Sequence, residues 1–414
     1  MNVNVIYCPA YQSGFGGVNM KEVVYVIDGM RTPFGSFGGV LSDVAAPQLA
    51  ATVIREILIR NELPPEAVGE VILGQVLSGG CGQAPARQAM RAAGLPDATP
   101  ALTINKVCGS GLKAVMLGSD SIQLGNAEIV LAGGMENMSL APYFLKKARN
   151  GFRMGNGEIF DMMIHDGLTD PYTGVHMGDI GEASIVRNSL TREEQDGLAI
   201  RSYQLAQAAV KEGVFKDEIA PVVKSVRGVD TVVADDEEPF KGDVDKIAKL
   251  KPVFKKDGSI TAGNASSIND GAAILLLASA AAVKKNNLTA KARIVASATS
   301  SLHPDFFPEA PVSAIQAVCV KAGLKIEDID LFEINEAFAS VPLIAIKNLK
   351  LDPAKVNVNG GACAIGHPIG ASGARLALTV VRELHKRNLR YGLATLCIGG
   401  GEAVAVIFEK IQGA

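Results

Sequence analysis

Apolar positions along the first part of the chain alternate between short β-branched runs and longer stretches with helical periodicity. The short runs, which we expect to form strands, cover residues 23–27, 70–74, 101–104 and 128–132. The periodic stretches, which we expect to form helices, cover residues 46–61, 84–93 and 112–124. Strands that alternate with helices predict an α/β fold, with a mainly parallel sheet covered by helices on both faces. The polar segment 28–34 is expected to form a turn.

This alternation is interrupted between about residues 141 and 262, where glycine, aspartate and methionine are frequent and charges cluster. Helical periodicity returns there near residues 192–212, and the acidic run Asp235–Glu238 is most simply a solvated loop. The alternation resumes at residues 270–276 and continues to the C-terminus. We therefore predict an inserted loop domain within an otherwise repetitive α/β chain.

The last third of the chain repeats the pattern of the first at a nearly constant offset. Three pairs of segments match at offsets of about 261 to 266 residues: 68–74 with 329–335, 110–111 with 372–373, and 129–134 with 393–400. Duplicated halves bring the ends of equivalent strands to one seam, and α/β sheets bind ligands at such ends. We divide the chain into an N-terminal extension, a first half, a loop domain and a second half: 1–19, 20–138 plus 268–288, 139–267, and 289–414.

Composition and charge narrow the functional classes. The chain has 414 residues, too many for one ordinary core, and its net charge of −3 argues against a general nucleic-acid binder. Its six cysteines show no CxxC spacing and do not form a disulfide framework, which favours a reducing compartment such as the cytoplasm. No apolar run reaches membrane-spanning length. Residues 1–19 contain no lysine or arginine and resemble no targeting signal, so Met20 could be an alternative start.

The segment from Asn105 to Leu112 contains the strongest candidate for catalysis. It places Cys108 between an extended run and a helix start, where free N–H groups and the helix dipole favour a thiolate. Gly109 and Gly111 leave room for a ligand or backbone to approach the sulfur. An inert, buried thiol is the alternative interpretation of this segment taken alone.

Two further reactive side chains fall at matching positions in the second half. His367 lies in a glycine-rich stretch that is the repeat partner of the Cys108 turn, so we expect it to face Cys108. Cys397 ends what we expect to be the last core strand. Two thiols and an imidazole at strand and helix ends form a nucleophile-and-base constellation. Taken singly, His367 could be a structural residue and Cys397 a core residue.

Other chemistries fit these motifs less well. Cys363 and His367 lie four residues apart, but no second pair completes a tetrahedral set, so no metal is expected. A serine hydrolase would need a G-x-S-x-G elbow, which is missing from the sequence. The glycines of residues 366–373 do not have the spacing of a dinucleotide-binding fingerprint.

Together these motifs resemble those of the thiolase family, and most closely its short-chain members that act on acetoacetyl-CoA. The resemblance runs from about Lys21 to the C-terminus and rests on five segments: 105–111, 133–136, 335–339, 366–368 and 397–401. It implies the thiolase fold, in which duplicated β-α-β-α-β halves form five αβαβα layers with an inserted loop domain. It also implies a reversible Claisen condensation of two acetyl-CoA to acetoacetyl-CoA and CoA, with no metal or redox cofactor.

The resemblance assigns roles to five residues. Cys108 would accept the acyl group, His367 would activate it, and Cys397 would abstract the α-proton of the second thioester. Asn335, through a held water, and His367 would form one oxyanion hole. The backbone N–H groups of Cys108 and Gly399 would form the other. Residues implied to contact pantetheine and CoA are Leu168, His176, Met177, Phe254, Ala262, Ser266, Ala337 and Phe338.

The dipeptide Phe307-Pro308 departs from many bacterial relatives of this kind, which have a methionine lining the acyl pocket. It is similar to the dipeptide of mitochondrial acetoacetyl-CoA thiolase, which also accepts 2-methyl-branched substrates. A broader 3-ketoacyl-CoA thiolase, which accepts branched or longer chains, is therefore the alternative function.

Two other functional classes compete with this interpretation. A ketoacyl synthase of the same fold would use Cys-His-His, whereas the third position here is Cys397. A non-catalytic CoA-binding or lipid-carrier scaffold would lack catalytic residues, and here Cys108, His367, Cys397 and Asn335 are all present. The resemblance further implies a homodimer or homotetramer and a role in fatty acid metabolism.

Overall fold

The repeated segments of the sequence build two joined halves of one sheet. The computed structural model describes residues 22–226 and 228–411, so the proposed extension 1–19 lies outside the described residues. The strands of the first half are β1 (Val24–Arg31), β3 (Glu70–Gly74), β4 (Ala101–Ile104), β5 (Ile129–Asn137) and β10 (Asn269–Ser279). Those of the second half are β11 (Ala292–Ser301), β12 (Leu331–Ile334), β13 (Tyr391–Ile398) and β14 (Glu402–Lys410).

The strand order shows the duplication directly. The first half has the order β4-β3-β5-β10-β1 and the second has β12-β13-β14-β11. The halves meet where Val26 of β1 pairs with Ala292 of β11. The parallel pair β3–β5 therefore matches the parallel pair β12–β13, and the antiparallel pair β5–β10 matches β13–β14. The repeat in the sequence is a repeat of the fold.

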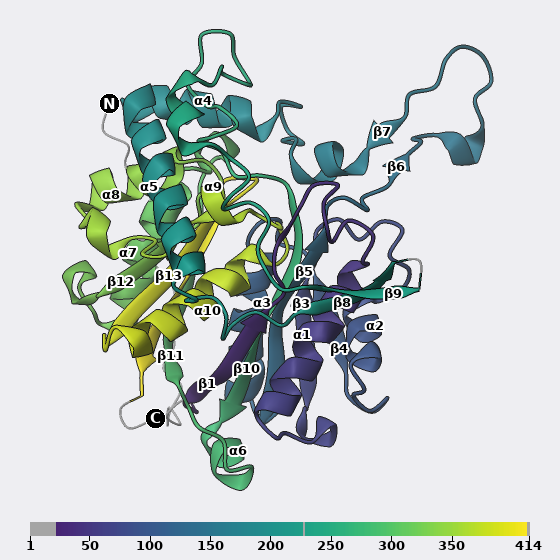
Figure 1. Cartoon of the computed structure of the whole chain (residues 1–414), viewed down its shortest axis with the longest axis vertical. Helices are drawn as coiled ribbons and strands as arrows, with labels where there is room; N and C mark the ends of the chain where they lie inside the picture. The colour runs from purple at the N-terminus through teal and green to yellow at the C-terminus, as the bar shows by residue number, and fades with distance from the viewer. Residues whose placement is uncertain (1–21, 227, 412–414) are drawn as a thin grey trace, which may run out of the picture.

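Three apolar cores arrange the helices into layers. The helices are α1 (Ala46–Arg60), α2 (Pro85–Ala92), α3 (Ser110–Gln123), α4 (Met177–Arg187), α5 (Arg192–Lys211), α6 (Ala280–Lys285), α7 (Ala310–Ala322), α8 (Ser340–Leu349), α9 (Ala362–Ile365) and α10 (Ser372–Lys386). One core packs α1 and α2 against the first half of the sheet, and another packs α7 and α8 against the second half. The core between the halves holds α3 and α10, which lie centrally in Figure 1. These αβαβα layers confirm the predicted fold class.

The prediction of a mainly parallel sheet is wrong. Parallel pairing is confined to β3–β4, β3–β5 and β12–β13, whereas β10, β1, β11 and β14 run antiparallel to their neighbours. The cause is connectivity. The last strand of each half, β10 or β14, follows an inserted segment or a tight turn. Neither connection is the crossover that joins parallel neighbours, so each of these strands runs antiparallel to its neighbours. Cys397 was expected to end the last core strand. It lies instead in β13, and β14 is the last strand.

Buried ion pairs explain two other differences from the predictions. β1 continues through the expected turn, where Asp28 pairs with Lys291 and Arg31 is fully buried. Arg31 donates to both carboxylate oxygens of Asp236, at 2.6 and 2.8 Å. The acidic run that contains Asp236 is therefore not a solvated loop but packs against β1. These partners lie far apart in the chain, so local sequence patterns do not reveal them.

The segment between β5 and β10 contains α4, α5 and two small hairpins. Helix α5, which was predicted, begins with a capping box between Thr191 and Glu194. Strands β6 (Tyr143–Phe144) and β7 (Phe160–Asp161) form an arm that extends from the body in Figure 1. Strands β8 (Val222–Val226) and β9 (Val229–Val233) form the second hairpin, and the short β2 (Gly35–Ser36) pairs with β10. The predicted domain boundaries stay a prediction. Over residues 22–226 and 228–411, no helix has the length and apolar character needed to cross a membrane.

Candidate active site

The turn that carries Cys108 is held in a strained conformation by its own side chains. Val107 has a φ of +45°, a value that a β-branched residue adopts only when its surroundings impose it. The Val107 N–H donates to Asn105 Oδ1 (2.8 Å), and its carbonyl accepts from Ser110 Oγ (2.7 Å). Helix α3 then begins at Ser110. These contacts fix the backbone from which the Cys108 side chain projects.

The hairpin between β13 and β14 closes over this turn from the second half. Gly109 has no room for a side chain, because a Cβ there would lie 2.3 Å from Ile398 Cδ1. The backbone N–H of Gly399, the residue after Ile398, lowers the pKa of the Cys108 thiol. Cys397 lies close enough to interact electrostatically with Cys108. The structure thus brings together Cys108, Cys397 and Gly399 from opposite halves of the chain.

Burial controls the protonation of both thiols. It raises the pKa of Cys108 to about 11 and outweighs the N–H groups of Gly399 and of Cys108 itself, which lower it. Burial, together with the neighbouring Cys108, raises the pKa of Cys397 well above its ordinary value. The thiolate expected at the helix N-terminus is therefore not the resting state, because desolvation exceeds the effect of the nearby N–H groups. Cys108 needs a base to become a nucleophile.

Alkylation of Cys108 by iodoacetamide is expected to report this raised pKa. Only the thiolate reacts, and the thiolate fraction rises about tenfold per pH unit below the pKa. The rate should therefore keep increasing from about pH 6 to about pH 10, with no plateau near neutrality. Peptide mass spectrometry would follow modification of Cys108 separately from that of Cys397. A rate that levels off below about pH 8 would show a stabilised thiolate instead.

His367 is a neutral imidazole whose position is set by hydrogen bonds to Asn269 and Ser372. Its backbone N–H donates to Asn269 Oδ1 (2.9 Å), and its Nδ1 lies 2.6 Å from Ser372 Oγ. Because the Ser372 hydroxyl donates to the Pro368 carbonyl (2.9 Å), it accepts from Nδ1–H, and Nε2 is the unprotonated ring nitrogen. Burial, and then the charge of Arg375, lower the pKa of His367 to about 3. His367 is therefore arranged to accept a proton at Nε2.

Asn335, directly after β12, extends the polar group around the imidazole. Its Nδ2 lies 3.4 Å from both ring nitrogens of His367, and its buried Oδ1 has no hydrogen-bond partner among the described residues. The adjacent Glu336 is buried and accepts from Ser202 Oγ (2.7 Å) and from the Cys363 N–H (3.1 Å). Glu336 therefore ties the end of β12 both to α5 and to the loop that leads to His367.

Glu136 is a second buried carboxylate that holds loops of the site together. In the sequence it appears only as part of a motif. Its carboxylate accepts from the backbone N–H groups of Val76 (3.0 Å), Leu77 (3.1 Å) and Gly370 (3.0 Å). Burial raises its pKa to about 7. The loop after β3, which packs near Cys108, is thereby joined to the loop that carries His367. An acidic residue inside a wholly buried strand was the signal that could have identified it.

Four of the residues assigned to substrate binding form an aromatic wall: His176, Phe254, Phe307 and Phe338. The ring of Phe338 lies 6.4 Å from that of Phe307 and 6.1 Å from that of Phe254. Phe254 in turn stacks on His176 at 4.9 Å. Met177, Phe307 and Phe338 pack in the same apolar cluster as Cys397. This wall can hold the apolar part of a thioester next to the second thiol.

The remaining assigned residues lie around this wall. Leu168 packs against the same apolar cluster as Cys108, and its carbonyl accepts from the Met177 N–H (2.9 Å). The Ser266 N–H donates to the Ala337 carbonyl (3.0 Å), which aligns the two segments. Ala262 is exposed, and its assignment depends on the resemblance alone.

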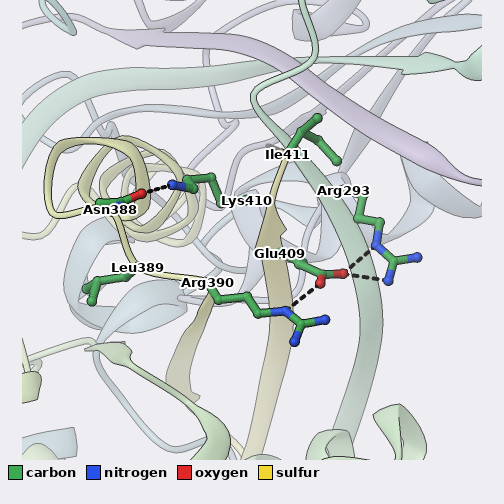
Figure 2. A pocket seen from close by; sticks show the side chains of 7 residues that line it. All are labelled: Arg293, Asn388, Leu389, Arg390, Glu409, Lys410 and Ile411. Atoms are coloured by element: carbon green, nitrogen blue, oxygen red, sulfur yellow. Dashed lines mark hydrogen bonds and ion pairs between the residues drawn. The ribbon is translucent and has the colours of Figure 1, made fainter. Parts of the chain in front are cut away.

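A surface hollow at the other end of β13 and β14 has different chemistry. It is lined by Arg293, Asn388, Leu389, Arg390, Glu409, Lys410 and Ile411. Figure 2 shows Arg293 and Arg390 both paired with Glu409, with N···O distances of 2.6 and 2.9 Å. This lining contains neither a thiol nor an imidazole, so the candidate site for acyl chemistry is the one around Cys108.

Comparisons with known proteins cover nearly the whole chain. Residues 24–281 match the model of the thiolase N-terminal domain, and residues 288–410 match that of the thiolase C-terminal domain. An acetyl-CoA acetyltransferase of Pseudomonas aeruginosa is 51% identical and covers 94% of this chain and 100% of its own. The corresponding protein of Chromobacterium violaceum is 50% identical, over 94% of this chain and 99% of its own. The crystal structure of Bacillus anthracis acetyl-CoA acetyltransferase has a TM-score of 0.93 and 42% identity, covering 95% of this chain and 100% of its own. The chain therefore belongs to the thiolase family.

Proposed function

We propose that this acyltransferase is an acetyl-CoA C-acetyltransferase that works through an acetyl-Cys108 intermediate. It condenses two acetyl-CoA to acetoacetyl-CoA and CoA, and it catalyses the reverse thiolysis. The observation that supports the proposal is the packing of the Cys108 turn on the end of β13, where Gly109 lies against Ile398, the residue between Cys397 and Gly399. The names of the P. aeruginosa and C. violaceum relatives agree with this activity.

In the first half-reaction, His367 Nε2 removes the proton of the Cys108 thiol. The thiolate attacks the carbonyl carbon of acetyl-CoA, and the N–H groups of Cys108 and Gly399 hold the oxyanion. When the intermediate collapses, the carbon–sulfur bond to CoA breaks and Cys397 protonates the departing thiolate. The site then contains acetyl-Cys108, an imidazolium and a Cys397 thiolate. One oxyanion donor is typically worth about 10²–10³ in rate.

In the second half-reaction, the Cys397 thiolate abstracts an α-proton from a second acetyl-CoA. Its raised pKa makes it a strong base once it has lost its proton to the first leaving group. The imidazolium of His367 and a water held by Asn335 stabilise the enolate oxygen. The α-carbon attacks acetyl-Cys108, acetoacetyl-CoA is released, and His367 returns a proton to Cys108. No oxidation state changes, so the proposed reaction needs no redox cofactor.

Replacing Ser372 with alanine is expected to lower kcat about tenfold to a hundredfold. The variant removes the acceptor for Nδ1–H and with it the preference for an unprotonated Nε2. KM should stay within about twofold, because Ser372 is fully buried behind the imidazole. Ser372→Thr keeps the hydroxyl and serves as the control in steady-state thiolysis assays. Equal losses in both variants would mean that packing, and not the hydrogen bond, is what matters.

The decisive test of the proposed function is incubation with acetoacetyl-CoA and CoA. We expect loss of the enolate absorbance of acetoacetyl-CoA and, after incubation with acetyl-CoA alone, an acetyl group on Cys108 by peptide mass spectrometry. A CoA-binding scaffold without catalysis would show neither result. A protein that decarboxylates malonyl thioesters instead would be a ketoacyl synthase.

Acceptance of 2-methyl-branched substrates is the second candidate activity, and Phe307 is the residue that favours it. Phe307 is buried against Phe338 in the cluster that contains Cys397. Phe307→Met is expected to lower kcat/KM for 2-methylacetoacetyl-CoA about tenfold relative to acetoacetyl-CoA, because pocket shape changes near the branch. The measurement is the ratio of the two kcat/KM values in wild type and variant. Equal refusal of the branched substrate by both proteins would remove this proposal.

The quaternary state and cellular setting are also proposals. The arm around β6 and β7 exposes Tyr143, Phe152 and Met154, and such apolar surface favours association into a homotetramer or a homodimer. Light scattering at several protein concentrations would measure the mass. Cys81, Cys108, Cys319, Cys363 and Cys397 are free thiols, which supports a cytoplasmic location. The condensation of acyl thioesters places the enzyme in fatty acid metabolism.

A further inference from the structure

A partly buried ion pair links the two halves beside the proposed oxyanion hole for the tetrahedral intermediate. Lys106 Nζ lies 2.5 Å from Glu402 Oε2, and the two side chains are 22% and 31% exposed. Ser301 Oγ donates to the other carboxylate oxygen of Glu402 (2.9 Å). Glu402 is therefore held on both oxygens. Neither Lys106 nor Glu402 belongs to the catalytic or substrate-binding residues described above.

Each residue of the ion pair lies next to one of the two turns that form this hole. Lys106 precedes Cys108 by two residues, and its carbonyl accepts from the Gly109 N–H (3.0 Å). Glu402 is the first residue of β14 and pairs directly with Ile398, so it closes the turn that contains Gly399. The ion pair therefore spans the two halves within a few residues of each backbone N–H donor.

The Gly399 turn contains three consecutive glycines, and the Gly401 carbonyl accepts from the Leu302 N–H (2.8 Å). Gly400 and Gly401 have φ values of +91° and +89°, and glycine has the widest backbone freedom of any residue. On the opposite side, Val107 is held at a strained φ of +45°. Two such turns keep a constant separation only if contacts outside their backbones restrain them. The ion pair supplies a restraint of this kind.

We propose that Lys106 and Glu402 are positioning residues that set the separation of the Cys108 and Gly399 N–H donors, an inference that rests on the proposed function. An oxyanion hole works only when its donors lie about 2.7–3.1 Å from the developing charge. Loss of a whole donor costs about 10²–10³ in rate, and a partly exposed ion pair contributes much less. Each neutralised variant is therefore expected to lose about threefold to tenfold in acetyl transfer, with KM nearly unchanged.

The test compares Lys106→Met, Glu402→Gln and the exchanged pair Lys106→Glu with Glu402→Lys. Lys113→Met is the matched control, because Lys113 also lies near Glu402 but makes no ion pair with it over the described ranges. We expect the single variants to slow Cys108 acetylation by acetyl-CoA about threefold to tenfold. The exchanged pair should recover to within about twofold of wild type, and Lys113→Met should match wild type.

Two further measurements separate positioning from a general structural role. Raising the salt from about 0.05 M to about 0.5 M should slow acetylation of wild type but not of Lys106→Met, because salt screens a partly exposed pair. Iodoacetamide alkylation of Cys108 forms no tetrahedral oxyanion, so it should change much less than acetylation in every variant. Unchanged acetylation in both single variants, an equal loss in Lys113→Met, or a slow exchanged pair would overturn the inference. Absence of acetylation in wild type would instead overturn the proposed function.

Discussion

Cys108→Ala is expected to lower thiolysis of acetoacetyl-CoA by about 10⁴-fold or more and to abolish acetylation of the protein. The Cys108 sulfur follows a strained turn, and the backbone N–H of Gly399 in the second-half hairpin lowers its pKa. Without it, the acetyl group has no covalent acceptor, and the oxyanion donors and His367 remain with no nucleophile to assist. The measurement is the steady-state rate together with the mass of the protein after incubation with acetyl-CoA.

Cys81→Ala is the matched control for this experiment. Cys81 is a partly exposed thiol in the loop after β3, and its sulfur accepts from Gln75 Nε2 (3.2 Å) outside the catalytic group. The control should keep full activity and its acetyl group. Thiolysis that survives in Cys108→Ala, or an acetyl group found on Cys81, would contradict the assignment of the nucleophile.

The features that could be predicted from the sequence are those that follow from repeated local patterns of residues. The near-constant offset between segments such as 68–74 and 329–335 predicted two similar halves, and the strand order confirms it. The same repeat predicts that His367 faces the Cys108 turn, which stays a prediction. Strand and helix ends are set by local periodicity, so α1 and α5 lie within a residue or so of their predicted bounds.

The features that could not be predicted depend on contacts between distant residues. Nothing local shows that Arg31 and Asp236 pair inside the core, or that three backbone N–H groups converge on Glu136. The protonation of Cys108 was misjudged for a related reason. A helix start is visible in the sequence, but the desolvation that raises the thiol pKa arises only in the assembled fold. Buried polar residues such as Arg31 and Glu136, and the protonation states of the thiols, can therefore be identified only in the folded structure.

The same assembled geometry predicts that Cys397→Ala will separate the two half-reactions. Abstraction of an α-proton from a thioester requires a positioned base, and loss of such a base typically costs about 10²–10⁴ in rate. Acetylation of Cys108 depends on His367 and the oxyanion donors, and a departing CoA thiolate is stable enough to take its proton from water. The variant should therefore acetylate Cys108 within about tenfold of the wild-type rate and lose condensation and thiolysis by about 10³-fold or more.

Hydrogen exchange at the methyl group of acetyl-CoA measures the affected step directly. In D₂O, wild type should replace the methyl protons with deuterium, whereas Cys397→Ala should exchange them no faster than free solution while acetyl-Cys108 accumulates. Cys363→Ala is the matched control, because Cys363 is equally buried and its thiol also has a strongly raised pKa, yet it bonds the Glu336 carbonyl away from Cys108. Rapid exchange in Cys397→Ala would place the α-proton base elsewhere, and His367 would then be the side chain left to perform both proton transfers. Failure of both half-reactions would mean instead that Cys397 supports the nucleophile itself, through the electrostatic coupling that joins the two thiols.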